Sequence, residues 1–190
     1  MKKKLLNQMQ PNYIKVYNDV IEPELSQQLI AMFEESEHQH EEVLLEGHRS
    51  FKQVTLQNHP EWEPFVKPLQ DKFYSYIDKY MNDCEVNDKM FPEQFAFEAF
   101  RLKRYMPNDV DEFNDHVDVG NHSSARRFLV FFLYLNDNEG GHTDFPTYDI
   151  SVQPVTGKMV MFPPMWTHLH AGRKPIDKPK YIIGSYLHYV

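Results

Sequence analysis

The sequence has little cysteine and little glycine, and each shortage narrows the possibilities. Cys84 is the single cysteine among 190 residues, so no disulfide can form within the chain. A reducing compartment is the simplest expectation for such a protein. Only 7 glycines stand against 13 prolines, a balance that favours ordered loops punctuated by proline over flexible linkers.

The sequence also lacks a long apolar run and an excess of positive charge. MKKKLLNQMQP begins with lysines as a secretory signal does, but its apolar part is two leucines long. That is too short for a signal peptide or a membrane span, so we expect a cytoplasmic protein. The formal net charge of −8 argues against a general attraction to nucleic acid or to an anionic membrane.

What is present is the composition of a globular protein. Hydrophobic residues make up 41% and charged residues 25% of the chain, and aromatic residues alone account for 14%. This composition predicts an aromatic-rich core and allows for an aromatic-lined cleft. The length suits one domain, and no internal repeat or linker divides the sequence, so we expect a single domain over residues 1–190.

The first part of the chain, residues 1–90, is expected to be mostly helical. An amphipathic helix is predicted from Pro23, where a first helical turn tolerates proline. Its apolar face consists of Leu25, Leu29, Met32 and Phe33. A second helical face, running toward Asn82, consists of Leu69, Phe73, Tyr76, Ile77 and Tyr80.

From about Phe95 onward the pattern changes to that of strands. FAFEAFRLKRYM alternates as a half-buried strand should. RFLVFFLYLN (127–136) is continuously apolar, which predicts a central strand buried on both faces, and further strands are predicted in TGKMVMFPP and KYIIGSYLHYV. Helices followed by many short strands indicate an α+β domain that is mainly β, with residues 95–190 forming an antiparallel sandwich or barrel.

Two residues at the end of a predicted strand have the chemistry of metal ligands. His116 and Asp118 are two positions apart, so on an extended segment their side chains share one face. With one more histidine they would complete the two-histidine, one-carboxylate triad that leaves open positions on Fe(II). The candidates for the third ligand are His168, His170 and His188.

The spacing alone leaves two questions open. The chain contains a second copy of the pattern, His142 and Asp144, and nothing in the spacing chooses between the copies. Zinc hydrolases also use sets of histidine and aspartate, so the identity of the metal is open as well.

Three further residues point to a ligand with two carboxylates. Lys180 begins the predicted strand ten residues beyond His170, and an antiparallel pair of strands joined across that turn could place its ammonium group inside the cavity. Tyr105 lies eleven residues before His116 on the preceding predicted strand, and Tyr134 lies in the predicted buried strand. A buried cation together with phenol hydroxyls is suited to hold the far carboxylate of a dicarboxylate.

The C-terminal half, about residues 96–190, resembles the Fe(II)- and 2-oxoglutarate-dependent dioxygenases, in particular their prolyl 4-hydroxylase-like branch. The matching segments, in order, are RYMPND, HVD, RFLVFFLYLN, GGHTDFP, VQPVTGKMVMFP and HAGRKPIDKPKYIIGSYLH. A weaker likeness is seen in VYNDVIEPELSQQLIAMF near the start. The resemblance implies a double-stranded β-helix, a distorted cupin-like jelly roll with the N-terminal helices packed outside.

Residue by residue, the resemblance implies a complete site. Its iron ligands would be His116, Asp118 and His170, because the family's distal histidine directly precedes the pair that is here Ala171-Gly172. The 2-oxoglutarate residues implied are Lys180, Tyr105, Tyr134 and Thr143, the last being the motif position instead of His142. Arg127 matches a position near the substrate entrance, and Trp166 is a candidate for the mouth of the site.

The resemblance implies an enzyme that uses Fe(II), 2-oxoglutarate and O₂, with ascorbate as an accessory reductant. It would hydroxylate an unactivated C–H bond, with proline in a peptide or protein as the implied substrate, and release succinate and CO₂. Two alternatives remain: a hydroxylase of a free amino acid or other small molecule, and a non-enzymatic jelly-roll binding module. A peptide enzyme is expected to have an open groove with mobile loops at residues 52–58 and 109–115.

Overall fold

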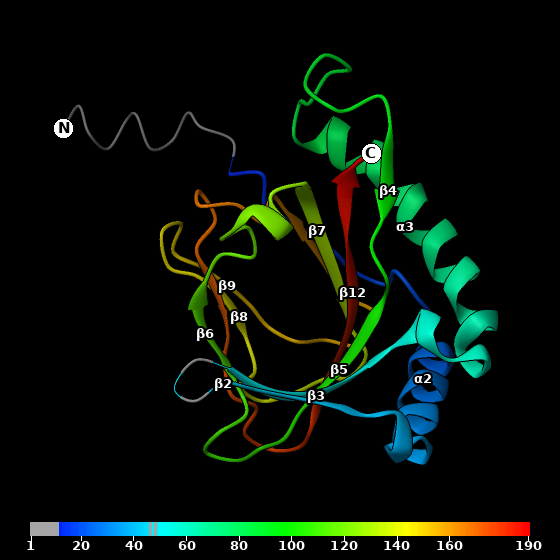
Figure 1. Cartoon of the computed structure of the whole chain (residues 1–190). Helices are drawn as coiled ribbons and strands as arrows, with labels where there is room; N and C mark the ends of the chain where they lie inside the picture. Colours follow the sequence, from blue (N-terminus) through cyan, green and yellow to red (C-terminus); the bar gives the residue numbers. More distant parts are fainter. Residues whose placement is uncertain (1–11, 46, 48) are drawn as a thin grey trace.

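The structure of the protein is a computed structural model that describes residues 12–45, 47 and 49–190. Two α-helices, α2 (Pro23–Glu35) and α3 (Glu63–Asp83), lie on the same side of a curled sheet (Figure 1). Four short 3₁₀ helices are η1 (Glu37–Gln39), η2 (Leu56–Asn58), η3 (Pro60–Trp62) and η4 (His122–Ser124). None of the described helices is long and apolar enough to cross a membrane.

The strands form one antiparallel sheet. They are β1 (Lys15–Tyr17), β2 (Glu41–Leu45), β3 (Arg49–Thr55), β4 (Phe95–Phe97), β5 (Arg101–Tyr105), β6 (Phe113–His116), β7 (Arg127–Tyr134), β8 (Thr143–Phe145), β9 (Ile150–Val152), β10 (Met159–Phe162), β11 (His170–Gly172) and β12 (Lys180–Tyr189). Their order is β1-β10-β7-β12-β5-β3-β6-β11-β8-β9, with β2 added to β3 and β4 to β12. The sheet curls so that β6, β8 and β9 stand opposite β7, β12 and β5 (Figure 1). This is the double-stranded β-helix expected from the sequence.

The two helices form where their apolar faces were expected. In α2, Leu29 and Phe33 are buried, and proline occupies a first-turn position, where a missing N–H leaves no hydrogen bond unmade. In α3, Phe73 is buried and its ring centroid lies 4.2 Å from that of Phe131 in β7. Burial of each such side chain contributes about 1.5–3 kcal/mol, so the helices are held to the outside of the sheet.

Strand β7 has a continuous apolar sequence because both of its faces are buried. Leu129, Phe131 and Leu133 belong to the core between the sheet and the helices. Val130 and Tyr134 belong to a second core inside the curl. The strand lies between β10 and β12, so the prediction of a central strand buried on both faces is confirmed.

Strands β5 and β12 divide their residues between the same two sides. Leu102 and Ile183 face the helices and belong to the helix-side core. Residues that alternate with them, Lys103, Tyr105 and Lys180, line a cavity inside the curl. The pairing of Lys180 with Tyr105 across the two strands brings their side chains to one end of this cavity.

Three details differ from the sequence-based expectation. FAFEAFRLKRYM forms two strands, β4 and β5, because residues 98–100 leave the ladder between them. Residues 52–58, expected as a mobile loop, lie in β3 and η2, where β3 pairs with both β2 and β5. The first 90 residues contribute three strands to the sheet besides their helices, which the search for helical faces did not reveal.

Candidate active site

Three potential metal ligands meet inside the curl at the ends of two paired strands. His116 ends β6 and His170 begins β11, and these two residues are direct register partners. Asp118 follows β6, where its backbone N–H donates a hydrogen bond to the carbonyl of Pro164. One ligand atom from each of the three side chains lies within 4.8 Å of the others. The arrangement fits one ion held by two imidazoles and one carboxylate.

Backbone carbonyls orient both imidazoles toward the aspartate. The Nδ1 atom of His116 lies 2.7 Å from the carbonyl oxygen of Asn114, and Nδ1 of His170 lies 2.9 Å from that of His168. Each Nδ1 therefore carries the proton, which leaves the Nε2 lone pair as the metal donor. The Nε2 atoms lie 3.4 and 3.5 Å from the two carboxylate oxygens of Asp118.

The charge states of this group also suit a divalent cation. Burial lowers the pKa of His170 to about 4, so its imidazole is neutral at pH 7. Burial by itself would raise the pKa of Asp118, but the neighbouring histidines and Lys103 outweigh it, and the net pKa lies below its ordinary value. A neutral imidazole and an ionised carboxylate are the forms that coordinate metal.

The second copy of the HxD pattern is used for structure instead. The carboxylate of Asp144 accepts hydrogen bonds from Ser151 at 2.6 Å and from Arg173 at 2.7 Å. Among the described residues, His142 is not part of a group of three metal-ligating side chains. The choice that the spacing left open is therefore decided in favour of the copy at residues 116–118.

The other candidate histidines do not join the group. Nε2 of His168 lies 2.7 Å from the carbonyl oxygen of Asn12, and its Nδ1 lies 2.8 Å from the hydroxyl of Thr167. His188 lies near the end of β12, where it is the register partner of Arg127 in β7. Neither histidine belongs to the metal-ligating group that the described part of the chain contains.

One end of the cavity beside the triad, the inner end, holds a buried ammonium group. Lys180 is 2% exposed, and its Nζ donates to the carbonyls of Gly141 at 2.9 Å and Arg173 at 3.1 Å. No carboxylate of the described residues lies within 4.0 Å of it. Burial lowers the pKa of Lys180 to about 7. A buried cation without a carboxylate partner is costly unless a ligand supplies the anion.

The route of Lys180 into the cavity differs from the one expected. Strands β11 and β12 do not pair with each other: β11 pairs with β6 and β8, and β12 with β4, β5 and β7. The chain crosses from one wall of the curl to the other between them. Gly141 makes room for the lysine, since a Cβ added there would lie 2.9 Å from Cδ of Lys180, and its positive φ of 61° suits glycine.

Three neutral hydroxyl groups line the same inner end. Tyr105, Tyr134 and Thr143 border the cavity together with the triad and Lys180. The Tyr134 hydroxyl donates to Oγ1 of Thr143 at 2.6 Å. Nζ of Lys180 lies 4.5 Å from the ring centroid of Tyr105. The structure thus brings together all four residues that the resemblance implied for 2-oxoglutarate.

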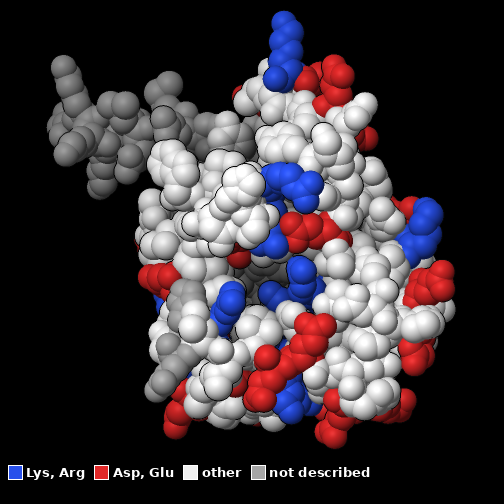
Figure 2. Space-filling view, viewed as in Figure 1, with Lys and Arg blue, Asp and Glu red and all other residues white. Residues whose placement is uncertain are grey.

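The other end of the cavity, which we call the outer chamber, opens to solvent and was not predicted. It measures about 350 Å³ and shares His116 and Asp118 with the inner end. Its cationic lining consists of Arg49, Arg101, Lys103 and Arg127. Figure 2 shows a hollow on this face with blue lysine and arginine atoms around and within it. The missed signal is the alternation of Arg101, Lys103 and Tyr105 in RLKRY, which puts all three on one face of β5.

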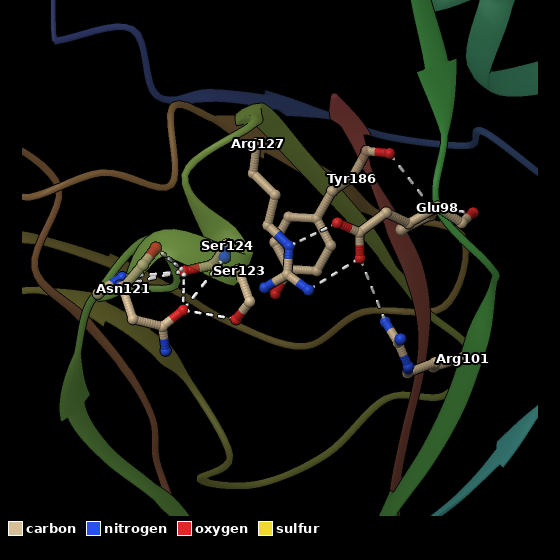
Figure 3. Close-up of polar contacts among 9 residues, drawn as sticks. Glu98, Arg101, Asn121, Ser123, Ser124, Arg127 and Tyr186 are labelled. Atoms are coloured by element: carbon tan, nitrogen blue, oxygen red, sulfur yellow. Dashed lines mark hydrogen bonds and ion pairs between the residues drawn. The ribbon is translucent and has the colours of Figure 1, made fainter. Parts of the chain in front are cut away.

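The two tentative substrate residues have different positions. Arg127 lines the outer chamber, where its guanidinium donates to both oxygens of Glu98, at 2.7 and 2.8 Å, and lies 4.0 Å from the centroid of the Tyr186 ring. Figure 3 shows this arrangement with Arg101 approaching the same carboxylate. Trp166 is 81% exposed and does not line either end of the cavity.

Comparison with known proteins agrees with this geometry. Residues 100–188 match the family model of the 2OG-Fe(II) oxygenase superfamily. No curated protein matches the sequence. Solved structures with the same fold include the 2-oxoglutarate complex of the viral collagen prolyl hydroxylase of Paramecium bursaria Chlorella virus-1. It is 21% identical, with a TM-score of 0.71, over 94% of this chain and 97% of that one.

Two more distant structures extend the fold comparison. A prolyl hydroxylase of Trichoplax adhaerens, in complex with a peptide fragment of the hypoxia inducible factor oxygen degradation domain, is 14% identical with a TM-score of 0.70 over 98% of this chain and 90% of that one. A prolyl-4-hydroxylase of Pseudomonas putida is 14% identical with a TM-score of 0.66 over the whole of both chains. The family match spans the segment that carries the triad: residues 100–188 match the 2OG-Fe(II) oxygenase superfamily, a family whose cofactors are Fe(II), 2-oxoglutarate and O₂.

Proposed function

We propose that this protein hydroxylates a proline residue of a peptide or protein, with release of succinate and CO₂. The observation that carries the proposal is the presence of a metal-ligating triad and a buried, unpaired lysine in a single cavity. A binding module of the same fold would have no need of both. The balanced reaction consumes one O₂, placing one oxygen atom in succinate and the other in the new hydroxyl group.

The triad would hold the iron, and its geometry suits this chemistry. His116, Asp118 and His170 all line the cavity, so an ion that they held would be open to ligands from the cavity. Bound there, Fe(II) with 2-oxoglutarate supplies the oxidising chemistry that side chains cannot provide. The contribution of the protein is to position the ligands, since the carbonyls behind both imidazoles limit their rotation.

The inner end would hold 2-oxoglutarate by its far carboxylate. Lys180 provides the charge, and its two carbonyl partners aim the ammonium group into the cavity. Tyr105, Tyr134 and Thr143 provide hydroxyl groups around it. Aromatic rings pack around one of the ligands and would exclude water there, since the ring centroids of Phe162 and Phe145 lie 4.8 and 5.9 Å from that of His170.

A peptide is favoured as the substrate by the shape of the outer chamber. It opens on the surface between the β2–β3 hairpin, which contributes Val43, and the segment that contributes Gly120 and Asn121. A free amino acid would instead need a closed pocket. The structures of like fold described above include three prolyl hydroxylases, one of them in complex with a peptide. Proline is proposed on that analogy.

The test is succinate formation from 2-oxoglutarate under Fe(II) and O₂, with and without proline-containing peptides. We expect peptide-stimulated turnover and a mass gain of one oxygen atom on the peptide. His116→Ala should abolish both, whereas His38→Ala, at an exposed position in η1, should change neither. Oxidation of free proline but of no peptide would contradict the peptide assignment, and absence of metal binding would contradict the enzyme.

A further inference from the structure

The outer chamber holds more positive charge than the carboxylates near it can neutralise. Four cationic residues line it, Arg49, Arg101, Lys103 and Arg127, and the one carboxylate in its lining is Asp118. That carboxylate is already assigned to the metal. In a chain with a net charge of −8, a cluster of cations facing one cavity is not explained by overall composition.

Glu98 neutralises only part of the cluster. Its two oxygens accept the paired hydrogen bonds of Arg127, and the arginine is also stacked on Tyr186. Arg101 approaches the same carboxylate more loosely, at 3.7 Å (Figure 3). One carboxylate supplies a single negative charge, which cannot neutralise two guanidinium groups. Arg127 is therefore a fixed part of the wall, and Arg101 retains most of its charge for a ligand.

Lys103 has no carboxylate of its own. Its Nζ lies 4.9 Å from the ring centroid of Phe51, and no acidic side chain of the described residues lies within salt-bridge distance. Burial, together with the nearby arginines, lowers its pKa to about 8, although Asp118 opposes the shift. Its neighbours on β5 lie on the other face of the strand, where Leu102 is part of the helix-side core and Arg104 pairs with Glu34.

Arg49 lines the chamber from β3, where it is the register partner of Phe113 in β6. Its guanidinium carbon lies 5.5 Å from the ring centroid of Phe113, and its Nε is buried without a hydrogen-bond partner among the described residues. Buried donors of native proteins are normally satisfied. Lys103 and Arg49 therefore present two charged groups to one space, and neither has a carboxylate partner among the described residues.

We propose that the outer chamber binds a carboxylate side chain of the substrate, an aspartate or glutamate close to the proline that is oxidised. Lys103, Arg101 and Arg49 are the residues that determine this specificity. The proposal rests on the proposed function, because it takes the substrate to be a peptide. Charge-assisted bonds to a carboxylate are among the stronger polar contacts, and here they would form beside the metal.

The main alternative is that Lys103 serves 2-oxoglutarate, because it lines both ends of the cavity. Lys180 already supplies a cation at the inner end, whereas Arg49 and Arg127 line the outer chamber alone. The cations therefore extend toward the substrate side. Measuring the two Michaelis constants separately distinguishes these assignments.

The experiment uses proline peptides that are identical except for one residue, which is aspartate, asparagine or lysine and is moved stepwise along both sides of the proline. At one position we expect aspartate to lower the peptide KM by roughly tenfold or more relative to asparagine. Lys103→Met should remove this preference and leave the KM for 2-oxoglutarate much less affected. Lys103→Glu should shift the preference toward the lysine peptide, a gain that a folding defect cannot produce.

The matched control is Lys52→Met, which removes a lysine from an exposed position of β3 and should keep the preference for aspartate. Equal turnover of aspartate and asparagine peptides at every position would overturn the inference and leave prolyl hydroxylation intact. A KM for 2-oxoglutarate that rises in Lys103→Met while peptide preference persists would assign the lysine to the cosubstrate. Hydroxylation of small carboxylic acids but of no peptide would overturn the proposed function as well.

Discussion

The two ends of the cavity use positive charge in different ways. At the inner end the ammonium group of Lys180 is enclosed and held by two backbone carbonyls, while Arg101 and Lys103 line both ends. In the outer chamber four cationic side chains face an open space, and only Arg127 has a paired carboxylate at short distance. The inner end is built for one small ligand of fixed shape. The outer chamber is built to attract charge without enclosing it.

This difference indicates how one cavity can serve a constant cosubstrate and a variable substrate. An enclosed charge with fixed partners is costly to leave unpaired, so it selects strongly for one anion. The cations of the outer chamber are half-buried beside an opening to solvent, which screens them in part, so each is expected to contribute less. Their number and position can therefore set a preference among substrates without determining whether the reaction takes place.

The largest effect is expected from removing the inner charge. Lys180→Met should raise the KM for 2-oxoglutarate by roughly 10- to 100-fold, since hydrogen bonds to charged groups contribute about 1.5–3 kcal/mol. Binding of Fe(II) should persist, because the triad is intact. Metal titration and 2-oxoglutarate kinetics check this, with Lys52→Met as the control. An unchanged KM would show that the inner end does not bind the cosubstrate.

The second largest effect is expected in the pH dependence of 2-oxoglutarate binding, which should come from the lysine at the inner end. The pKa of Lys180 is lowered to about 7 in the unliganded protein, and only its protonated form pairs with a carboxylate. Below pH 7 the group is already charged, whereas above pH 7 binding must take up a proton. The dissociation constant for 2-oxoglutarate should therefore rise with pH, by up to roughly tenfold per unit.

Anaerobic calorimetry with Fe(II) measures this dissociation constant. Lys180→Arg is the control, because a guanidinium stays charged throughout this range and should flatten the profile. A flat profile for the native protein would mean that the ammonium group is charged before the ligand arrives. Lys103, the other cavity lysine with a lowered pKa, is removed in Lys103→Met, and the pH dependence should persist in that variant.

The smallest effect is expected for a neutral hydroxyl group at the inner end. Tyr134→Phe removes the hydrogen bond to Thr143 and should raise the KM for 2-oxoglutarate by roughly 2- to 10-fold, corresponding to about 0.5–1.5 kcal/mol. Tyr181→Phe is the matched control. Tyr181 lies on the face of β12 that packs against the helices, away from the cavity, and its hydroxyl donates to Glu34. Equal effects of the two changes would point to general loss of stability.

Much of the fold could be predicted from local pattern. The helix at Pro23–Glu35 and the doubly buried strand at Arg127–Tyr134 each follow from the spacing of apolar residues. Strands β1, β2 and β3, which the described residues before position 90 contribute to the sheet, could not be found that way. Strand β3 carries an irregular mixture of polar and apolar residues, and it becomes a strand because β2 and β5 complete its hydrogen bonds.

The parts of the site that follow from the order of motifs could be predicted from the sequence. The parts that depend on which strand faces lie opposite each other could not. His116 and Asp118 were candidates from spacing, but His142 and Asp144 had the same spacing. The copies differ because β6 brings His116 into register with His170, whereas Asp144 is held by Arg173. The outer chamber was missed because its cations come from β3, β5 and β7, and no local pattern joins them.

The sequence by itself determined which residues could coordinate a metal or carry charge, and it predicted the two α-helices and the central strand β7, because those properties depend on side-chain chemistry and on period along the chain. Only the tertiary structure decided which HxD pair meets a second histidine, that Lys180 enters the cavity without a β11–β12 hairpin, and that Lys103 and Arg49 face one space. The physical reason is that a curled sheet brings together strands that are far apart in sequence. Which faces meet is set by the packing of the whole domain.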